Sequence, residues 1–178
     1  MTRHTRTAAM LLGSLALLAA APSAAASARQ TVVACDLGAY VIDPDPNGLN
    51  VRAGPGTGHR VIGKLPGGTS NSVEVEVTGA SGQWLRIRNA TVIDEAEPRF
   101  RGPGWVFARM LGTGTSDHGP VTLYRQPRRG SPAAGRLDTG TQVTLLGCRG
   151  GWAQVHVANL TGWLDPQSQC SATQTTCS

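Results

Sequence analysis

The sequence lacks the short motifs that mark common hydrolase centres. It contains no Gly-x-Ser-x-Gly elbow and no His-Glu-x-x-His zinc motif. Its four cysteines show no Cys-x-x-Cys spacing and no neighbouring histidine, which disfavours a metal site. His59, His118 and His156 are far apart in the sequence and fit surface positions. These absences predict no catalytic residues, no metal and no cofactor, and hence a protein that is not an enzyme.

Strong charge of one sign is also lacking. The formal net charge of +5 falls to +3 once an N-terminal leader carrying Arg3 and Arg6 is removed. Basic residues do not alternate with aromatic ones in a stripe, so nucleic acid is not a predicted partner. The arginines at 125, 128 and 129 could contact anionic wall polymers, but a solvated loop is the simpler interpretation.

Long apolar segments are missing except at residues 8–21, which are too few to span a bilayer comfortably. This run follows a basic start and precedes the cleavage pattern Ala26-Ser27-Ala28. Residues 1–28 are therefore predicted to be a cleaved secretory signal peptide. An uncleaved anchor helix and a lipoprotein attached at Cys35 are the alternatives. We expect the protein outside the cytoplasm, secreted or in the cell envelope, without a stable membrane span.

The cysteines are few but even in number, which in an exported chain predicts two disulfides. Three pairings are possible for Cys35, Cys148, Cys170 and Cys177, and the sequence does not select one. A Cys148–Cys170 bond would staple the second half of the chain. Cys35 and Cys177 would then tie the two chain ends together.

The chain contains an internal repeat. Residues recur at an offset of 72, at the pairs Val51/Leu123, Pro55/Pro127, Gly63/Gly135, Leu65/Leu137 and Gly68/Gly140. Two copies are too few for a solenoid, so each copy should form a small domain. The spacing of 21 residues from Trp84 to Trp105 shrinks to 11 in the second copy, between Trp152 and Trp163. The first copy therefore carries an inserted loop at residues 89–101, rich in acidic and basic side chains.

Apolar and polar residues alternate in short runs, which predicts half-buried strands. Val73, Val75 and Val77 alternate with glutamates, and glycine-rich turns separate such runs. We predict an all-β protein with two small antiparallel barrels in tandem. The expected domains are 29–112 and 121–170, joined by a flexible connector at 113–120 and followed by a tail at 171–178.

Four segments of the first copy carry a family resemblance: residues 48–56 (GLNVRAGPG), 61–68 (VIGKLPGG), 82–87 (GQWLRI) and 104–106 (GWV). Their order and spacing closely resemble the bacterial SH3-like (SH3b) domain. The second copy is similar but less close, because LYRQP at 123–127 replaces the first pattern. The resemblance implies SH3-like barrels that work outside the cytoplasm on cell-wall peptides or glycopeptides. Such domains are often attached to a wall hydrolase, which is not recognised in this sequence.

Seven residues are candidates for ligand binding. Alternation places Trp84 and Trp152 on the wetter strand faces, where an indole can stack on a sugar or a peptide plane. Packing over the barrel core is the competing interpretation of both, as it is of the two tryptophans that follow a glycine. Asn50 and Arg52 flank an inward-facing position of the predicted strand. Their side chains could hold a peptide carbonyl or carboxylate, or could stabilise a turn. The remaining candidates are Trp105, Tyr124 and Trp163.

The sequence thus predicts an exported, monomeric, non-catalytic binding protein. Its expected partner is a cell-wall peptide, a glycopeptide of peptidoglycan, or a protein of the cell envelope. One alternative is a protein that binds or inhibits another exported enzyme through the loop at 89–101. A second alternative is a wall hydrolase with unrecognised chemistry.

Overall fold

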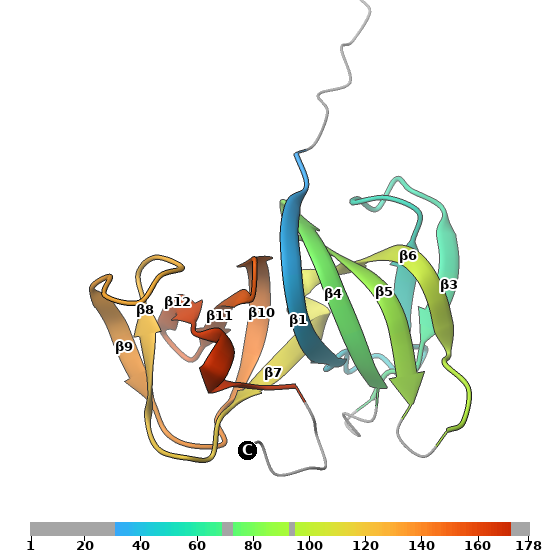
Figure 1. Cartoon of the computed structure of the whole chain (residues 1–178). Coiled ribbons are helices and arrows are strands. Elements are labelled where there is room, and N and C mark those ends of the chain that lie inside the picture. Colours follow the sequence, from blue (N-terminus) through green and yellow to red (C-terminus); the bar gives the residue numbers. More distant parts are fainter. Residues whose placement is uncertain (1–30, 69–72, 93–94, 172–178) are drawn as a thin grey trace, which may run out of the picture.

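The computed structural model describes residues 31–68, 73–92 and 95–171. The predicted signal peptide, Asp94 and Cys177 lie outside these residues. The described residues form thirteen strands and two short 3₁₀ turns, arranged as two groups of curved strands beside each other (Figure 1). Among them, no helix has the length and apolar character needed to cross a membrane. The predicted all-β architecture with two SH3-like units is confirmed.

The first unit contains six strands. In chain order they are β1 (Val33–Val41), β2 (Leu49–Arg52), β3 (Val61–Leu65), β4 (Val73–Ser81), β5 (Trp84–Val92) and β6 (Phe100–Phe107). Neighbours pair antiparallel in the order β3-β2-β6-β5-β4-β1. The predicted alternation is present, because Val73, Val75 and Val77 of β4 are buried while Glu76 is exposed. Burial of one strand face around a shared core stabilises this unit.

The second unit repeats the pattern. Its strands are β7 (Leu111–Thr115), β8 (Val121–Tyr124), β9 (Ala133–Leu137), β10 (Gln142–Arg149), β11 (Trp152–Val157), β12 (Leu160–Leu164) and β13 (Gln169–Cys170). The 3₁₀ turns are η1 (Ala108–Met110) before β7 and η2 (Pro166–Ser168) before β13. Strands β7-β10-β11-β12-β8-β9 continue the sheet, and β13 pairs with β7. Leu123, Leu145, Val155 and Leu164 are fully buried in its core.

The two units share a continuous sheet, because β1 pairs with β4 on one side and with β7 on the other. Residues 113–115, which the sequence placed at the start of a flexible connector, lie in β7 and are buried. The glycines of β7 serve close packing: a Cβ at Gly112 would lie 2.9 Å from Cγ2 of Ile42, and one at Gly114 would lie 3.3 Å from the Cys170 carbonyl oxygen. The glycines of this segment, which led us to predict a flexible connector, therefore do not indicate flexibility at residues 113–115.

A disulfide joins the units between Cys35 of β1 and Cys148 of β10, with Cα atoms 5.7 Å apart. The pairing of Cys148 with Cys170 suggested from the sequence is wrong. The reason is that the pairing of β1 with β4 has a register shift between Ala34 and Leu37, and there Cys35 lies beside Gly150 of the second unit, whose amide donates to the Ala34 carbonyl at 2.8 Å. Cys170 also forms a disulfide. A Cys35 held in a disulfide is not available for a lipid anchor.

The inserted loop at 89–101 forms an extension of the β5–β6 hairpin. Asn89 faces Arg101 and Ala90 faces Phe100 across the two strands. Two exposed ion pairs lie within this extension, Glu95 with Arg99 and Glu97 with Arg101. Its charged side chains therefore largely neutralise one another.

Candidate functional site

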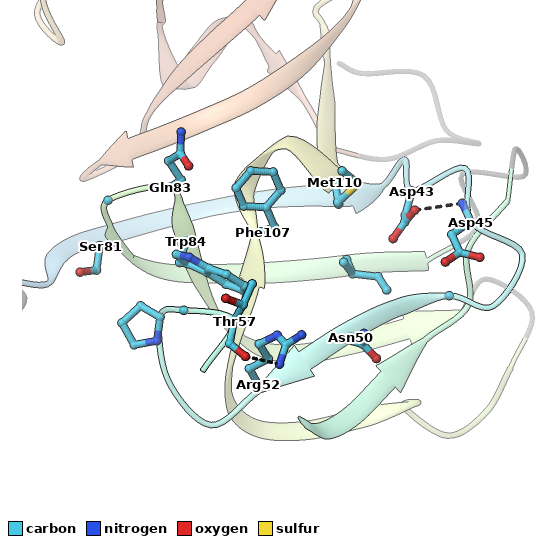
Figure 2. Close-up of a pocket in the computed structure, with 15 residues that line it drawn as sticks. Asp43, Asp45, Asn50, Arg52, Thr57, Ser81, Gln83, Trp84, Phe107 and Met110 are labelled. Carbon is cyan, nitrogen blue, oxygen red and sulfur yellow. Dashed lines mark hydrogen bonds between the residues drawn. The ribbon is translucent and has the colours of Figure 1, made fainter. Parts of the chain in front are cut away.

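A cavity of about 740 Å³ opens on the first unit (Figure 2). We call it the first groove. The end of β2 and the loop after it form one wall, and the β4–β5 turn, the end of β6 and η1 form the other. Its lining comprises Asp43, Asp45, Gly48, Leu49, Asn50, Arg52, Pro55, Gly56, Thr57, Ser81, Gly82, Gln83, Trp84, Phe107 and Met110.

The β4–β5 turn delivers Trp84 to the groove. Ser81 faces Trp84 across a two-residue turn, Gly82 and Gln83, in which Gly82 has a φ of 56° that favours glycine. The backbone carbonyl of Gln83 accepts the Ala108 amide at 2.9 Å, which ties the turn to η1. The start of β5 is thereby held at the rim of the groove.

Two aromatic rings form one wall of the first groove. Trp84 faces Phe107 across β5 and β6, and the ring centroids lie 5.8 Å apart at an interplanar angle of 61°. Both residues are half-buried, so each ring leaves part of its surface open to a ligand. Aromatic faces of this kind stack on peptide planes and sugar rings and attract cations.

Arg52 forms part of the opposite wall and also organises it. Its Nη1 donates to the backbone carbonyls of Thr57 at 3.0 Å and His59 at 2.9 Å, which fixes the loop that follows β2. Turn stabilisation, one of the two interpretations of this residue, is therefore part of its role. Its Nε and Nη2 donate to no acceptor within the described residues, so these donors can serve a carbonyl or carboxylate of a ligand.

Two carboxylates, which sequence reasoning missed, line another part of the groove. Asp43 is 9% exposed, and its Oδ1 accepts the Asp45 amide at 2.9 Å. The Oδ1 of Asp45 accepts the amide of Asn47 at 2.8 Å and its Nδ2 at 2.9 Å. The segment Asp-Pro-Asp-Pro-Asn-Gly at residues 43–48 has a sequence typical of a turn. It forms that turn, and it also places two carboxylates in the lining of the groove.

The structure brings together three of the seven predicted site residues. Asn50, Arg52 and Trp84 line the first groove. Trp105 pairs with Arg52 but is 8% exposed and packs in the first unit rather than lining the groove. The other predicted residues, Tyr124, Trp152 and Trp163, belong to the second unit and lie on β8, β11 and β12.

A smaller hollow of about 390 Å³ marks the matching place on the second unit. We call it the second groove. Its lining includes Thr122 and Tyr124, which correspond to Asn50 and Arg52 at the offset of 72. Asp165 stands two residues after Trp163, as Phe107 stands two residues after Trp105. Tyr124 contacts Trp152 edge to face, with ring centroids 5.7 Å apart.

An arginine of the chain itself occupies the second groove. Arg129 makes two bonds to the Asp165 carboxylate, of which Nη2 to Oδ1 is 2.8 Å, and Nη2 also donates to Oε1 of Gln167 at 2.7 Å. The hydrogen bonds from Arg129 hold the pKa of Asp165 below its ordinary value, and the Gln167 amide adds to this while burial opposes it. The Asp165 side chain is only 7% exposed. The two grooves therefore differ in chemistry although they share one scaffold.

Comparisons with known proteins agree with the repeat. The bacterial SH3 domain family matches residues 47–112 and 119–168. A curated relative is "Putative N-acetylmuramoyl-L-alanine amidase YrvJ" from Bacillus subtilis (strain 168), 28% identical over 143 residues. The match covers 68% of this chain and 24% of the relative, so the chain spans about a quarter of the relative's length.

Two solved structures are also similar in part. NlpC1 from Trichomonas vaginalis matches with 16% identity and a TM-score of 0.30, over 82% of this chain and 48% of that one. NlpC2 from the same organism matches with 14% identity and a TM-score of 0.29, over 75% and 47%.

The relative corrects one prediction. The sequence predicted that the protein is not an enzyme, and the finding that its curated relative is named as an amidase contradicts this. The prediction was based on missing motifs. Motifs of three to five residues identify only the chemistries that use them, so their absence was a weak ground for excluding catalysis.

Proposed function

Because the chain belongs to the bacterial SH3 domain family, we propose that its first groove binds peptides of the bacterial cell wall and brings them to amidase chemistry. The observation that carries this proposal is the groove itself, in which Trp84 and Phe107 offer stacking faces opposite Arg52, whose Nε and Nη2 have no acceptor among the described residues. A peptide offers flat amide planes to the rings and carbonyls to the guanidinium. In this proposal the protein acts outside the cytoplasm as a monomer.

In this proposal the second unit does not bind the peptide that the first groove binds. Tyr124 replaces the guanidinium donors of Arg52, and the Arg129–Asp165 ion pair fills part of the second groove. One peptide cannot make matching contacts in both grooves. The proposed binding site is therefore single.

Sedimentation with purified peptidoglycan tests the proposal. Trp84→Ala should weaken retention about tenfold or more, as expected for a central aromatic contact residue. Trp152→Ala is the matched control, because that indole makes the same kind of edge-to-face contact in the second unit. Equal retention of the wild type and Trp84→Ala, or a larger loss in Trp152→Ala, would contradict the proposal. Release of soluble peptide from the same pellets reports amidase turnover directly.

A further inference from the structure

Asp43 is a buried carboxylate without a cationic partner among the described residues. It is 9% exposed, and among the described residues its carboxylate makes one hydrogen bond, which Oδ1 accepts from the Asp45 amide. Figure 2 shows the other carboxylate oxygen turned away from that bond, and Asp43 is among the residues that line the groove. A carboxylate removed from water is costly unless a cation or further donors meet it. An oxygen in this position is therefore suited to meet a cation from outside the chain.

The second groove shows how the same scaffold treats a buried carboxylate. There Asp165 is met by the guanidinium of Arg129, which comes from the loop after β8. The matching position in the first unit, at the offset of 72, is Thr57, whose carbonyl binds Arg52 instead. Thus, within the described part of the chain, no basic side chain of the loop after β2 forms an ion pair with Asp43 or Asp45. A cation carried by a ligand would complete the surroundings of Asp43.

The rest of the first groove favours a cation as well. Asp43 and Asp45 together exceed the charge of Arg52, the basic residue in the lining. Arg52 is held away from the carboxylates by the carbonyls of Thr57 and His59. The Trp84 and Phe107 rings add faces that attract an ammonium group.

We propose that the first groove selects ligands that carry a primary ammonium group, placed at Asp43, with a carbonyl or carboxylate of the same ligand at Arg52. This rests on the proposed function and narrows it to peptides with a free amine. The amine could be a peptide N-terminus or the side chain of a diamino acid, since both present the same charge and donors. Asp43 supplies the countercharge, and Asp45 positions Asp43 through its amide.

The test compares peptidoglycan before and after its free amines are acetylated. Wild-type protein should bind the acetylated material about tenfold more weakly or worse. Asp43→Asn keeps an oxygen for the Asp45 amide and removes the charge, so it should weaken binding to untreated material by a similar factor and be insensitive to acetylation. Asp36→Asn is the control, because Asp36 is exposed on β1 and outside the groove.

Each outcome decides between the two proposals. If wild type binds both preparations equally while Trp84→Ala still weakens binding, the ammonium proposal is overturned and the groove proposal stands. If Trp84→Ala has no effect, both are overturned. A lysine-containing tripeptide with either its α-amine or its side-chain amine acetylated then identifies the source. Weaker binding of one singly acetylated peptide, or of both, supports the proposal. If a peptide acetylated at both amines binds as tightly as the unmodified peptide, the proposal is overturned.

Discussion

Arg52 and Tyr124 occupy matching positions in the two repeats, yet they give the two grooves different chemistry. Arg52 orders its loop through two backbone carbonyls and keeps further donors for a ligand. Tyr124 packs against Trp152, and the cation of the second groove comes from Arg129 instead. A change of one side chain at the end of β8 is therefore linked to a new ion pair across the groove.

The Arg129–Asp165 pair gives a pH-dependent prediction. Asp165 has a lowered pKa in the folded protein, so its contribution to stability is present above its ordinary pKa of about 4 and is lost as the pH falls through the lowered value. Arg129→Gln should lower the melting temperature by a few degrees at pH 7, and the difference from wild type should shrink as the pH falls below the ordinary pKa of an aspartate. Arg128→Gln, an exposed neighbour, is the control. A difference that stays the same, or grows, as the pH is lowered would contradict this assignment.

Among the elements, β6 approaches β2 more closely than any residue larger than glycine permits. A Cβ at Gly104 would lie 2.2 Å from Cγ1 of Val51 and 2.8 Å from Cζ of Phe100. Val51 is fully buried and cannot move outward without opening the core. The missing side chain at Gly104 thus makes room for the side chains of Val51 and Phe100.

Gly104→Ala should therefore destabilise the protein by about 1–3 kcal/mol through overpacking. Chemical denaturation followed by tryptophan fluorescence measures this. Gly58→Ala is the matched control, since a Cβ at Gly58 has no heavy atom within 4 Å. Equal stability of the two variants would show that β2 and β6 can separate at no cost.

The extended β5–β6 hairpin is the element that the docking alternative requires. Its two ion pairs are exposed, and such pairs contribute little to stability. A variant with Glu95, Glu97, Arg99 and Arg101 all changed to Gln should keep both its melting temperature and its retention on peptidoglycan. Loss of retention in this variant would move the binding site from the first groove to the hairpin.

At the scale of the whole molecule, β1 and the Cys35–Cys148 bond make the two repeats one body. The bond closes a sequence separation of 113 residues. Replacing both cysteines with serine should lower the free energy of unfolding by about 2–4 kcal/mol, because the unfolded chain gains freedom. Denaturant titration of the double variant checks this, and an unchanged unfolding midpoint would show that strand pairing alone holds the repeats.

Local patterns predicted most of the fold and part of the site. Alternation at Val73, Val75 and Val77 predicted the first part of β4 correctly, and the motif around Asn50 and Arg52 lies on one wall of the groove. The cysteine pairing was missed because β1 precedes the repeat and its neighbours are set by tertiary contacts. Asp43 was missed because its burial depends on how the loop after β1 folds over the groove, which residue spacing does not report.

The most direct test of the account follows the indole N–H signals of the four tryptophans by NMR during titration with soluble peptidoglycan peptides. Each indole reports on one place, since Trp84 lines the first groove and Trp152 lies in the second unit. The account predicts that the Trp84 signal shifts with saturation while those of Trp152 and Trp163 stay in place. Saturable shifts at Trp152 and Trp163 with an unmoved Trp84 signal would contradict it.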